Sequence, residues 1–418
     1  MNFSLSPNTQ AILLLTAPLI AGRNEQSVDL IKPHEYKRLA RYLREIKHQP
    51  SDLLSNDANE LIQSCNHIID IDRITRLLGR GFLLSQVVEQ WRSRSIWVIS
   101  RADPQYPRRL KRALRENTPA LLYGCGDIKL LNTGGLAVVG PRKADNSLLN
   151  YSNNIGQLCA KAQKTLISGG AKGVDLAAMT GAQLTGGTVC NVMAENLEKA
   201  AIDRDNREHI LNNRLVLVSA YDPKAGFNVG HAMQRNKLIY GLSQAALVVD
   251  ATENKGGTWA GAAEQLDTLN LVPVYVRSSG PISAGLDALR NKGALSWSNP
   301  SSPEEIIEIL DNIHTIKNNS SMQVTGSLFD NIVEHEALNT TQFSPRQEQT
   351  NSEKLFYFVQ ALLIEMLKKP MNEKEVAEEL NISKSQAAAW LALLVEEDKL
   401  TKLTKPIRYT IKPLEVMR

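Results

Sequence analysis

An α/β fold built on a parallel sheet is predicted for the middle of this chain of 418 residues. Six short apolar runs rich in valine and isoleucine alternate with stretches that mostly have room for a helix. These runs cover residues 136–139, 166–168, 188–192, 215–219, 246–249 and 272–276. They are continuously apolar, as expected of strands that crossover helices bury on both faces. Glycine-rich segments follow several of them, where a parallel sheet carries its ligand-binding loops.

The composition is that of an ordinary soluble globular protein. The chain is 43% apolar and 22% charged, and its length suggests two to four domains. The net charge of +4 is too small to indicate a nucleic-acid partner by itself. The four cysteines are scattered and form no CxxC pair, which argues against a structural metal and a disulfide framework. That usage predicts a reducing cytoplasm.

Residues 1–100 have the pattern of a helical N-terminal region, with apolar and basic positions at helical spacing over 34–43 and helices expected over 71–78 and 83–91. The apolar run 11–22 lacks a basic segment before it and is interrupted by Pro18, so we expect a buried helix or turn, not a signal peptide. No stretch reaches the roughly 18 apolar residues of a membrane span, so we expect no membrane partner. A short strand at 96–99 and a turn at 103–107 lead into an α/β domain over 101–313.

The C-terminal part reads as a linker and a small domain. Residues 314–351 are rich in Asn, Ser, Thr and Gln and show little periodicity, which is typical of a linker. Within 352–418, an apolar helix face precedes a second helix that Asn372 can cap, with Glu375 at the capping-box position. A third helix over 384–397 and two short extended runs complete the order of a winged helix-turn-helix.

Four segments at strand ends are candidate phosphate-binding loops. The first carries Gly140, Arg142 and Lys143 and could equally be a surface turn with solvated cations. The second joins a strand to a helix. Its candidate residues are Ser168, Gly169, Gly170, Lys172 and Gly173. Consecutive glycines let backbone N–H groups converge at a helix N-terminus, which favours an anion site over a turn needed only for packing. It is neither GxGxxG nor a P-loop, so it specifies no dinucleotide or ATP.

The third segment places Arg235, Asn236 and Lys237 before an apolar helix face, a set that suits phosphates and base edges, or else a solvated helix turn. The fourth repeats the strand–glycine–helix junction with Gly256, Gly257 and Thr258. No catalytic set, metal-ligand spacing or cofactor motif is recognisable, so we expect neither an enzyme nor a bound cofactor.

Taken in order, these motifs resemble the DprA/Smf family of DNA-processing proteins. The pattern is Gly-x-Arg-Lys, Ser-Gly-x-Ala-x-Gly-x-Asp, Arg-Asn-x-x-Ile with Gly-Leu-Ser, then Gly-Gly-Thr, and the similarity runs from 103 to 294. The resemblance implies an extended Rossmann fold, single-stranded DNA binding, a homodimer and, in the best-known members, delivery of DNA to a RecA-type recombinase during transformation. It implies a set of phosphate-binding residues. They are Arg142, Lys143, Ser168, Gly169, Gly170, Lys172, Arg235, Asn236 and Lys237. Met179 stands where the family has histidine, and Pro141 where it prefers serine. These departures indicate a divergent branch of the family, with a role in recombination, DNA uptake or antiviral defence.

Three alternatives stay open. A nucleotide sensor or nucleotide-cleaving enzyme of the LOG-like phosphoribohydrolase type would use the same sheet edge, with Glu264 as its acid. The segment 323–329, with Leu328, faintly resembles a sliding-clamp-binding peptide of an adaptor. The winged helix would contact DNA through cations of its tail and third helix, or serve protein interaction. The DNA-contact candidates there are Lys384, Lys402, Lys405 and Arg408.

Overall fold

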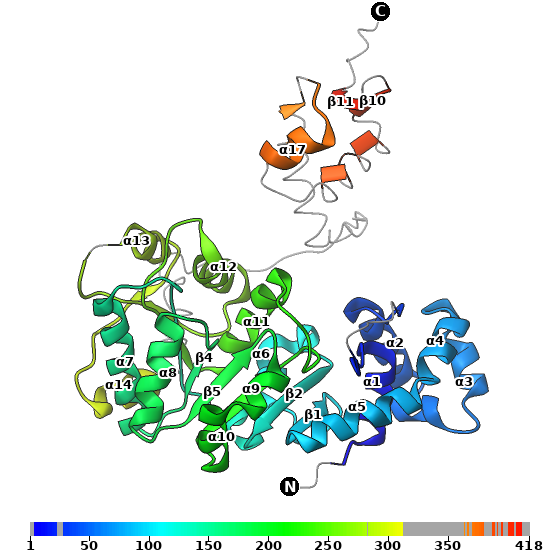
Figure 1. Ribbon diagram of the computed structural model, residues 1–418, viewed down its shortest axis with the longest axis horizontal. Helices are drawn as coiled ribbons and strands as arrows, with labels where there is room; N and C mark the ends of the chain where they lie inside the picture. The colour runs from blue at the N-terminus through cyan, green and yellow to red at the C-terminus, as the bar shows by residue number, and fades with distance from the viewer. Residues whose placement is uncertain are drawn as a thin grey trace, which may run out of the picture. The chain divides into compact units, whose positions relative to one another are not determined.

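A computed structural model gives the fold (Figure 1). It describes residues 4–22, 28–281 and 283–311, and in the C-terminal part 363, 366–367, 370–379, 387–388, 391, 394–395, 400–404 and 407–411. The chain divides into two compact units, Met1–Ser327 and Leu328–Arg418, and each is described by itself.

A nine-stranded sheet forms the centre of the first unit. Its strands are β1 (Ile96–Ser100), β2 (Leu121–Gly126), β3 (Leu136–Val139), β4 (Leu166–Ser168), β5 (Val189–Met193), β6 (Leu215–Ser219), β7 (Ala245–Val248), β8 (Val274–Val276) and β9 (Leu295–Ser296). Their spatial order is β1-β2-β6-β5-β4-β3-β7-β8-β9. Neighbours from β6 to β9 are parallel, whereas β2 is antiparallel to both β1 and β6. The six strands predicted from the apolar runs, and the parallel α/β core, are confirmed.

Helices bury both faces of this sheet. One apolar cluster takes Leu136 and Val138 of β3 together with α7 (Asn146–Lys161), α8 (Val174–Leu184), α9 (Leu197–Ile202) and α14 (Pro303–Asp311). The opposite cluster takes Ala137 and Val139 together with α6 (Arg108–Leu114), α11 (Val229–Leu242), α12 (Gly256–Glu264) and α13 (Ala284–Asn291). Alternate residues of one strand therefore enter different cores, which is why the strands read as unbroken apolar runs.

The chain order creates a switch point beside β3. From β3 the chain moves outward through β4 and β5 to β6, then returns to the other side of β3 for β7, β8 and β9. The helices that follow β3 and β7, α7 and α12, belong to opposite faces. Open α/β sheets bind ligands at such a switch point, at the carboxyl ends of the strands on its two sides. Helix α10 (Arg204–Leu211), a π-helical turn (Gln265–Leu269) and short 3-10 turns at Arg115–Asn117 and Ile128–Asn132 complete this part.

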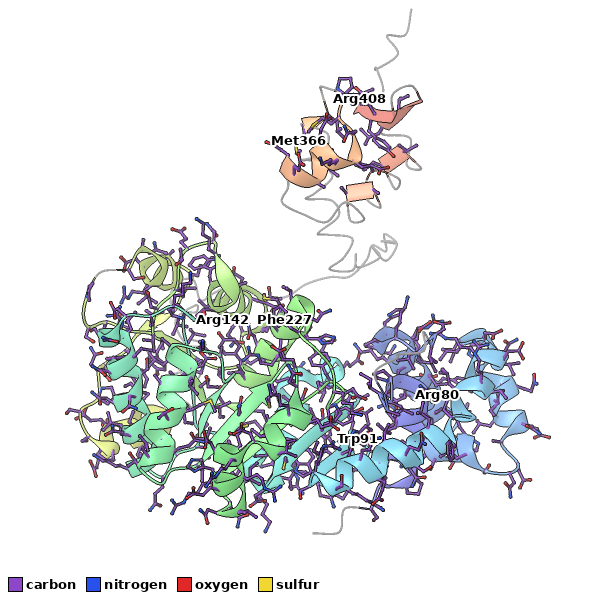
Figure 2. All side chains as sticks on the ribbon, viewed as in Figure 1. Arg80, Trp91, Arg142, Phe227, Met366 and Arg408 are labelled. Atoms are coloured by element: carbon purple, nitrogen blue, oxygen red, sulfur yellow. The ribbon has the colours of Figure 1, made fainter. Side chains whose placement is uncertain are left out.

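The N-terminal region is helical, as predicted. Its helices are α1 (Pro7–Thr16), α2 (Pro33–Glu45), α3 (Asn59–Ser64), α4 (Ile71–Leu78) and α5 (Gly81–Ser93), with 3-10 turns at Pro50–Leu54 and Cys65–His67. Residues 11–15 of α1 are buried, so the apolar run there is a buried helix. The guanidinium of Arg80, labelled in Figure 2, donates to the carbonyls of Leu14 and Ala17 at the end of α1.

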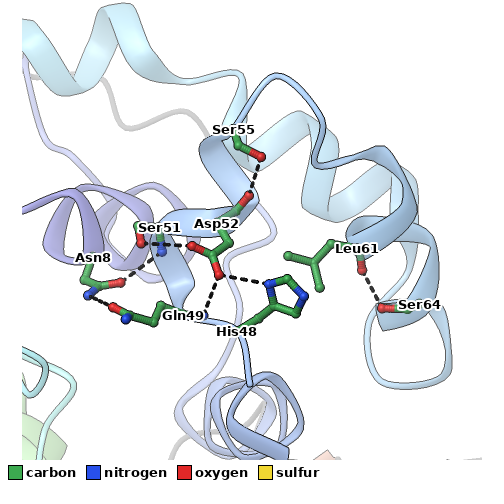
Figure 3. Close-up of polar contacts among 8 residues, drawn as sticks. All are labelled: Asn8, His48, Gln49, Ser51, Asp52, Ser55, Leu61 and Ser64. Carbon is green, nitrogen blue, oxygen red and sulfur yellow. Dashed lines mark hydrogen bonds and ion pairs between the residues drawn. The ribbon is translucent and has the colours of Figure 1, made fainter. Parts of the chain in front are cut away.

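Polar side chains close the turn between α2 and α3 (Figure 3). Asp52 accepts hydrogen bonds from the Gln49 backbone N–H and from the His48 ring, each at 2.9 Å. The backbone bond is the main reason that the pKa of Asp52 is lowered. The side chain of Asn8 in α1 accepts a hydrogen bond from the Ser51 N–H at 3.0 Å, which connects the turn to α1.

In the second unit, the structure describes α17 (Glu373–Glu379) and a hairpin of β10 (Leu400–Thr404) and β11 (Ile407–Ile411). The predicted capping box is present, because Asn372 accepts the Glu375 N–H at 3.0 Å and Glu375 accepts the Asn372 N–H at 2.8 Å. The winged helix as a whole stays a prediction, and the expected linker 314–351 and the segment 323–329 lie outside the described residues. Among the described residues, no helix is both long and apolar enough to span a membrane.

Candidate functional site

The loops after β3 and β4 meet at the carboxyl edge of the sheet. The Thr258 hydroxyl, in the first turn of α12, donates to the Gly140 carbonyl at 2.8 Å and so joins the loop after β7 to the same place. Asn236 of α11 donates to the Gly257 carbonyl at 3.2 Å. The structure therefore brings the four predicted segments together at one edge, although the third, with Arg235, Asn236 and Lys237, lies within helix α11 and is not a loop.

The loop after β4 needs its glycines. Gly170 and Gly173 have φ values of +65° and +89°, in the left-handed region that favours glycine. A Cβ on Gly173 would also lie 2.4 Å from the Pro141 carbonyl oxygen of the neighbouring loop. The backbone N–H groups of Gly170, Ala171 and Lys172 have no acceptor among the described residues. Three unpaired donors in a glycine loop leading into a helix suit an anion.

Asp175, in the first turn of α8, connects the loops after β3 and β4 through hydrogen bonds. Its two carboxylate oxygens accept the N–H groups of Gly140 and Gly169, each at 3.3 Å. Burial raises the pKa of Asp175, and the charge of Arg235 opposes that shift. The sequence motif contains Asp175, but spacing alone did not reveal its role, which is to hold the loops together.

Arg235 lies beneath the glycine loop. Only 9% of it is exposed, and its Nε has no hydrogen-bond partner in the part of the chain that the structure describes. Burial lowers the pKa of this guanidinium, while the carboxylate of Asp175 acts in the opposite direction. Arg235 is therefore a buried counterpart of the Asp175 carboxylate and is not positioned as an exposed phosphate ligand.

Three predicted cations are exposed together. Arg142, Lys143 and Lys172 line an open cleft of about 810 Å³ between the N-terminal halves of α7 and α8. None of the three forms an ion pair with another described residue. The two helices also approach each other backbone to backbone, since a Cβ on Gly156 would lie 2.0 Å from the Ala178 carbonyl oxygen.

Other predicted residues have different surroundings from those expected. The Ser168 hydroxyl is buried and donates to the Val138 carbonyl at 2.6 Å, so it links β4 to β3. The Lys237 ammonium pairs with Glu264 at 3.0 Å. Glu264, the acid on which a LOG-like activity would depend, is therefore engaged with a cation. Gly256 is exposed with φ at +79° and has open space around its Cα.

The C-terminal candidates are only partly described. Arg408 donates to the Pro370 carbonyl at 2.7 Å and to Glu375 at 3.3 Å, which ties β11 to the start of α17. Lys402 lies in β10, and Lys384 and Lys405 lie outside the described residues. Within the described residues, no three His, Cys, Asp or Glu side chains gather as metal ligands would.

Comparisons with known proteins identify relatives of the central α/β domain. A family model described as DNA recombination-mediator protein A matches residues 97–311, just over half of the chain. The DNA processing protein DprA of Bacillus subtilis (strain 168) is 28% identical over 238 residues, which cover 54% of this chain and 76% of the relative. The DprA of Streptococcus pneumoniae (strain ATCC BAA-255 / R6) is 30% identical over 142 residues, covering 34% of this chain and 50% of that protein.

A solved structure shows the same fold. The X-ray structure of DprA from Streptococcus pneumoniae matches 73% of this chain and 98% of that chain, with a TM-score of 0.54 and 17% sequence identity. The resemblance inferred from the loop motifs is thereby confirmed.

Proposed function

The chain belongs to the DNA recombination-mediator protein A family, also called DprA/Smf, and on that premise we propose that it binds single-stranded DNA through phosphates at the carboxyl edge of its sheet. It acts as a DNA-processing protein in recombination or DNA uptake. The observation that carries the proposal is the grouping of Arg142, Lys143 and Lys172 around a glycine loop with three unpaired N–H groups. A group of exposed cations and N–H donors suits the phosphates of a single strand.

The electrostatics favour a polyanion over a small neutral ligand. The exposed cations Arg142, Lys143 and Lys172 have no ion-pair partners among the described residues, so their charge is available to a polyanion. An open cleft bordered by cations releases counterions when it binds a phosphate backbone, which makes the affinity depend on salt. A nucleotide-cleaving activity is not favoured, since Glu264 is paired with Lys237 and the matched relatives are DNA-processing proteins.

Fluorescence anisotropy with a labelled oligo-dT tests this proposal. Replacing Arg142, Lys143 and Lys172 together by alanine should weaken binding on the order of tenfold or more at moderate salt. The matched control replaces Lys129, Lys161 and Arg214, three exposed cations at the opposite, amino edge of the sheet, and should bind as the unchanged protein does. No binding of oligo-dT by the unchanged protein, or equal losses in the two triple variants, would contradict the proposal.

The family also suggests the wider setting. We propose a cytoplasmic, non-enzymatic homodimer that passes DNA to a RecA-type recombinase. Analytical ultracentrifugation would measure the oligomeric state, and a pull-down with a RecA-type protein in the presence of oligo-dT would test the partner. A monomer at all concentrations, or no DNA-dependent capture, would remove the corresponding part of the proposal.

A further inference from the structure

Phe227 is an apolar side chain in solvent beside the cation-lined cleft. It lies in the segment between β6 and α11 and is 56% exposed. It is absent from the apolar clusters that form the cores of the first unit. The ring therefore contributes nothing to those cores and leaves an apolar aromatic face open to solvent.

The segment that carries Phe227 is anchored on both sides. Before it, the Lys224 N–H donates to the Asp222 carboxylate at 3.0 Å, and the Ala225 carbonyl accepts the Asn196 N–H at 2.8 Å. After it, Asn228 caps α11 by accepting the His231 N–H at 3.2 Å. The ring of His231 stacks on Tyr221, with centroids 3.7 Å apart and planes 14° from parallel. These contacts hold the segment in place and leave the phenylalanine ring outside.

Phe227 also faces a phosphate-binding candidate. The Arg142 guanidinium carbon is 5.9 Å from the centroid of the Phe227 ring, and the two residues are labelled side by side in Figure 2. A cation that binds a phosphate next to an exposed aromatic ring reproduces the pairing of charge and stacking surface used for single strands. A duplex keeps its bases stacked inside, so such a ring is useful only to an unpaired base.

We propose that Phe227 is a base-stacking residue: a nucleobase adjoining the phosphate held by Arg142 stacks on the exposed face of its ring. This rests on the proposed single-stranded DNA binding and specifies which part of the DNA the site recognises besides the backbone. Every base offers a flat π-face, so the contact tolerates any sequence. It distinguishes single strands from duplexes, which the cations alone do not.

The test compares oligo-dT with an abasic oligonucleotide of the same length, whose sugar–phosphate backbone carries no bases. Phe227→Ala should weaken binding of oligo-dT by roughly tenfold and leave binding of the abasic strand unchanged. Phe227→Tyr keeps a flat ring and should restore the affinity for oligo-dT. Phe82→Ala is the matched control, because Phe82 is 78% exposed in α5 of the N-terminal region and should have no effect on either probe.

The outcomes separate this inference from the proposed function. If the unchanged protein binds oligo-dT and Phe227→Ala binds it equally well, the stacking role is wrong while DNA binding stands. If Phe227→Ala loses affinity for both probes alike, the side chain supports the loop and does not stack on a base. If the unchanged protein does not bind oligo-dT, the proposed function itself fails.

Discussion

The guanidinium of Arg235 lies so close to the backbone of Gly169 that a Cβ added to Gly169 would be 1.2 Å from Nη1. Glycine at this position is thus required by a neighbouring side chain. The glycine loop lies directly on a buried cation, and the loop and the cation depend on each other for their positions. Any side chain at position 169 has to displace one of them.

Gly169→Ala should therefore displace Arg235 or the loop. We expect the affinity for oligo-dT to fall on the order of tenfold. Thermal stability should also decrease, because the buried guanidinium of Arg235 would be displaced from its native position. Gly81→Ala is the control, because a Cβ at Gly81 meets nothing within 4 Å. Circular dichroism melting and anisotropy measure the two effects. Wild-type affinity and melting temperature in Gly169→Ala would show that the loop and Arg235 are not coupled.

Thr258→Val removes the hydroxyl that donates to the Gly140 carbonyl while keeping the shape of the side chain. The carbonyl loses its partner, and we expect the free energy of unfolding to fall by about 1 kcal/mol. Denaturant titration measures it. Thr252→Val, at an exposed position, should leave the free energy of unfolding nearly unchanged. An equal effect of the two substitutions would mean that the bond between α12 and the β3 loop contributes nothing.

Asp222 should make stability depend on pH. Burial raises the pKa of Asp222 from 3.8 to about 6, so the folded protein holds this proton to a higher pH than the unfolded chain. The carboxyl therefore contributes most to the free energy of unfolding below about pH 4. This contribution, on the order of 3 kcal/mol, is lost as pH rises through about 6.

Asp222→Asn carries no titrating group at this position. The difference in the free energy of unfolding between the unchanged protein and this variant should fall by that amount between pH 4 and pH 7. Denaturant titrations at several pH values measure the difference, which cancels the titration of the other groups. A difference that is flat across this range would contradict the raised pKa.

The sequence predicts the parallel core well because buried strands have a strong local signature. It misses β2, where Gly124 and Gly126 interrupt the apolar pattern, although a Cβ on Gly124 would be 2.3 Å from the Trp97 ring. It also misses the two-residue strand β9, which is too short to show a pattern. The convergence of the glycine loops is predictable, since the carboxyl ends of parallel strands share one edge.

Side-chain direction within the site is harder to predict from motifs. Arg235, Asn236 and Lys237 are consecutive, so a helix must point them in different directions. Arg235 is three, four and seven residues before Leu238, Ile239 and Leu242, which are all buried. That spacing places it on the core face of α11, and helical periodicity could have indicated its burial. Nothing local indicates that the Ser168 hydroxyl bonds to Val138, because that contact depends on the pairing of β3 and β4.

The salt dependence of oligo-dT binding tests the central claim most directly. For single strands, the slope of log affinity against log salt concentration changes by about 0.7 for each phosphate contact. If Arg142, Lys143 and Lys172 each neutralise one phosphate, their joint replacement by alanine should make that slope shallower by about 2. Replacement of Lys129, Lys161 and Arg214 should leave it unchanged. The same slope in the unchanged protein and in the Arg142, Lys143 and Lys172 variant would show that the DNA backbone does not bind at this edge of the sheet.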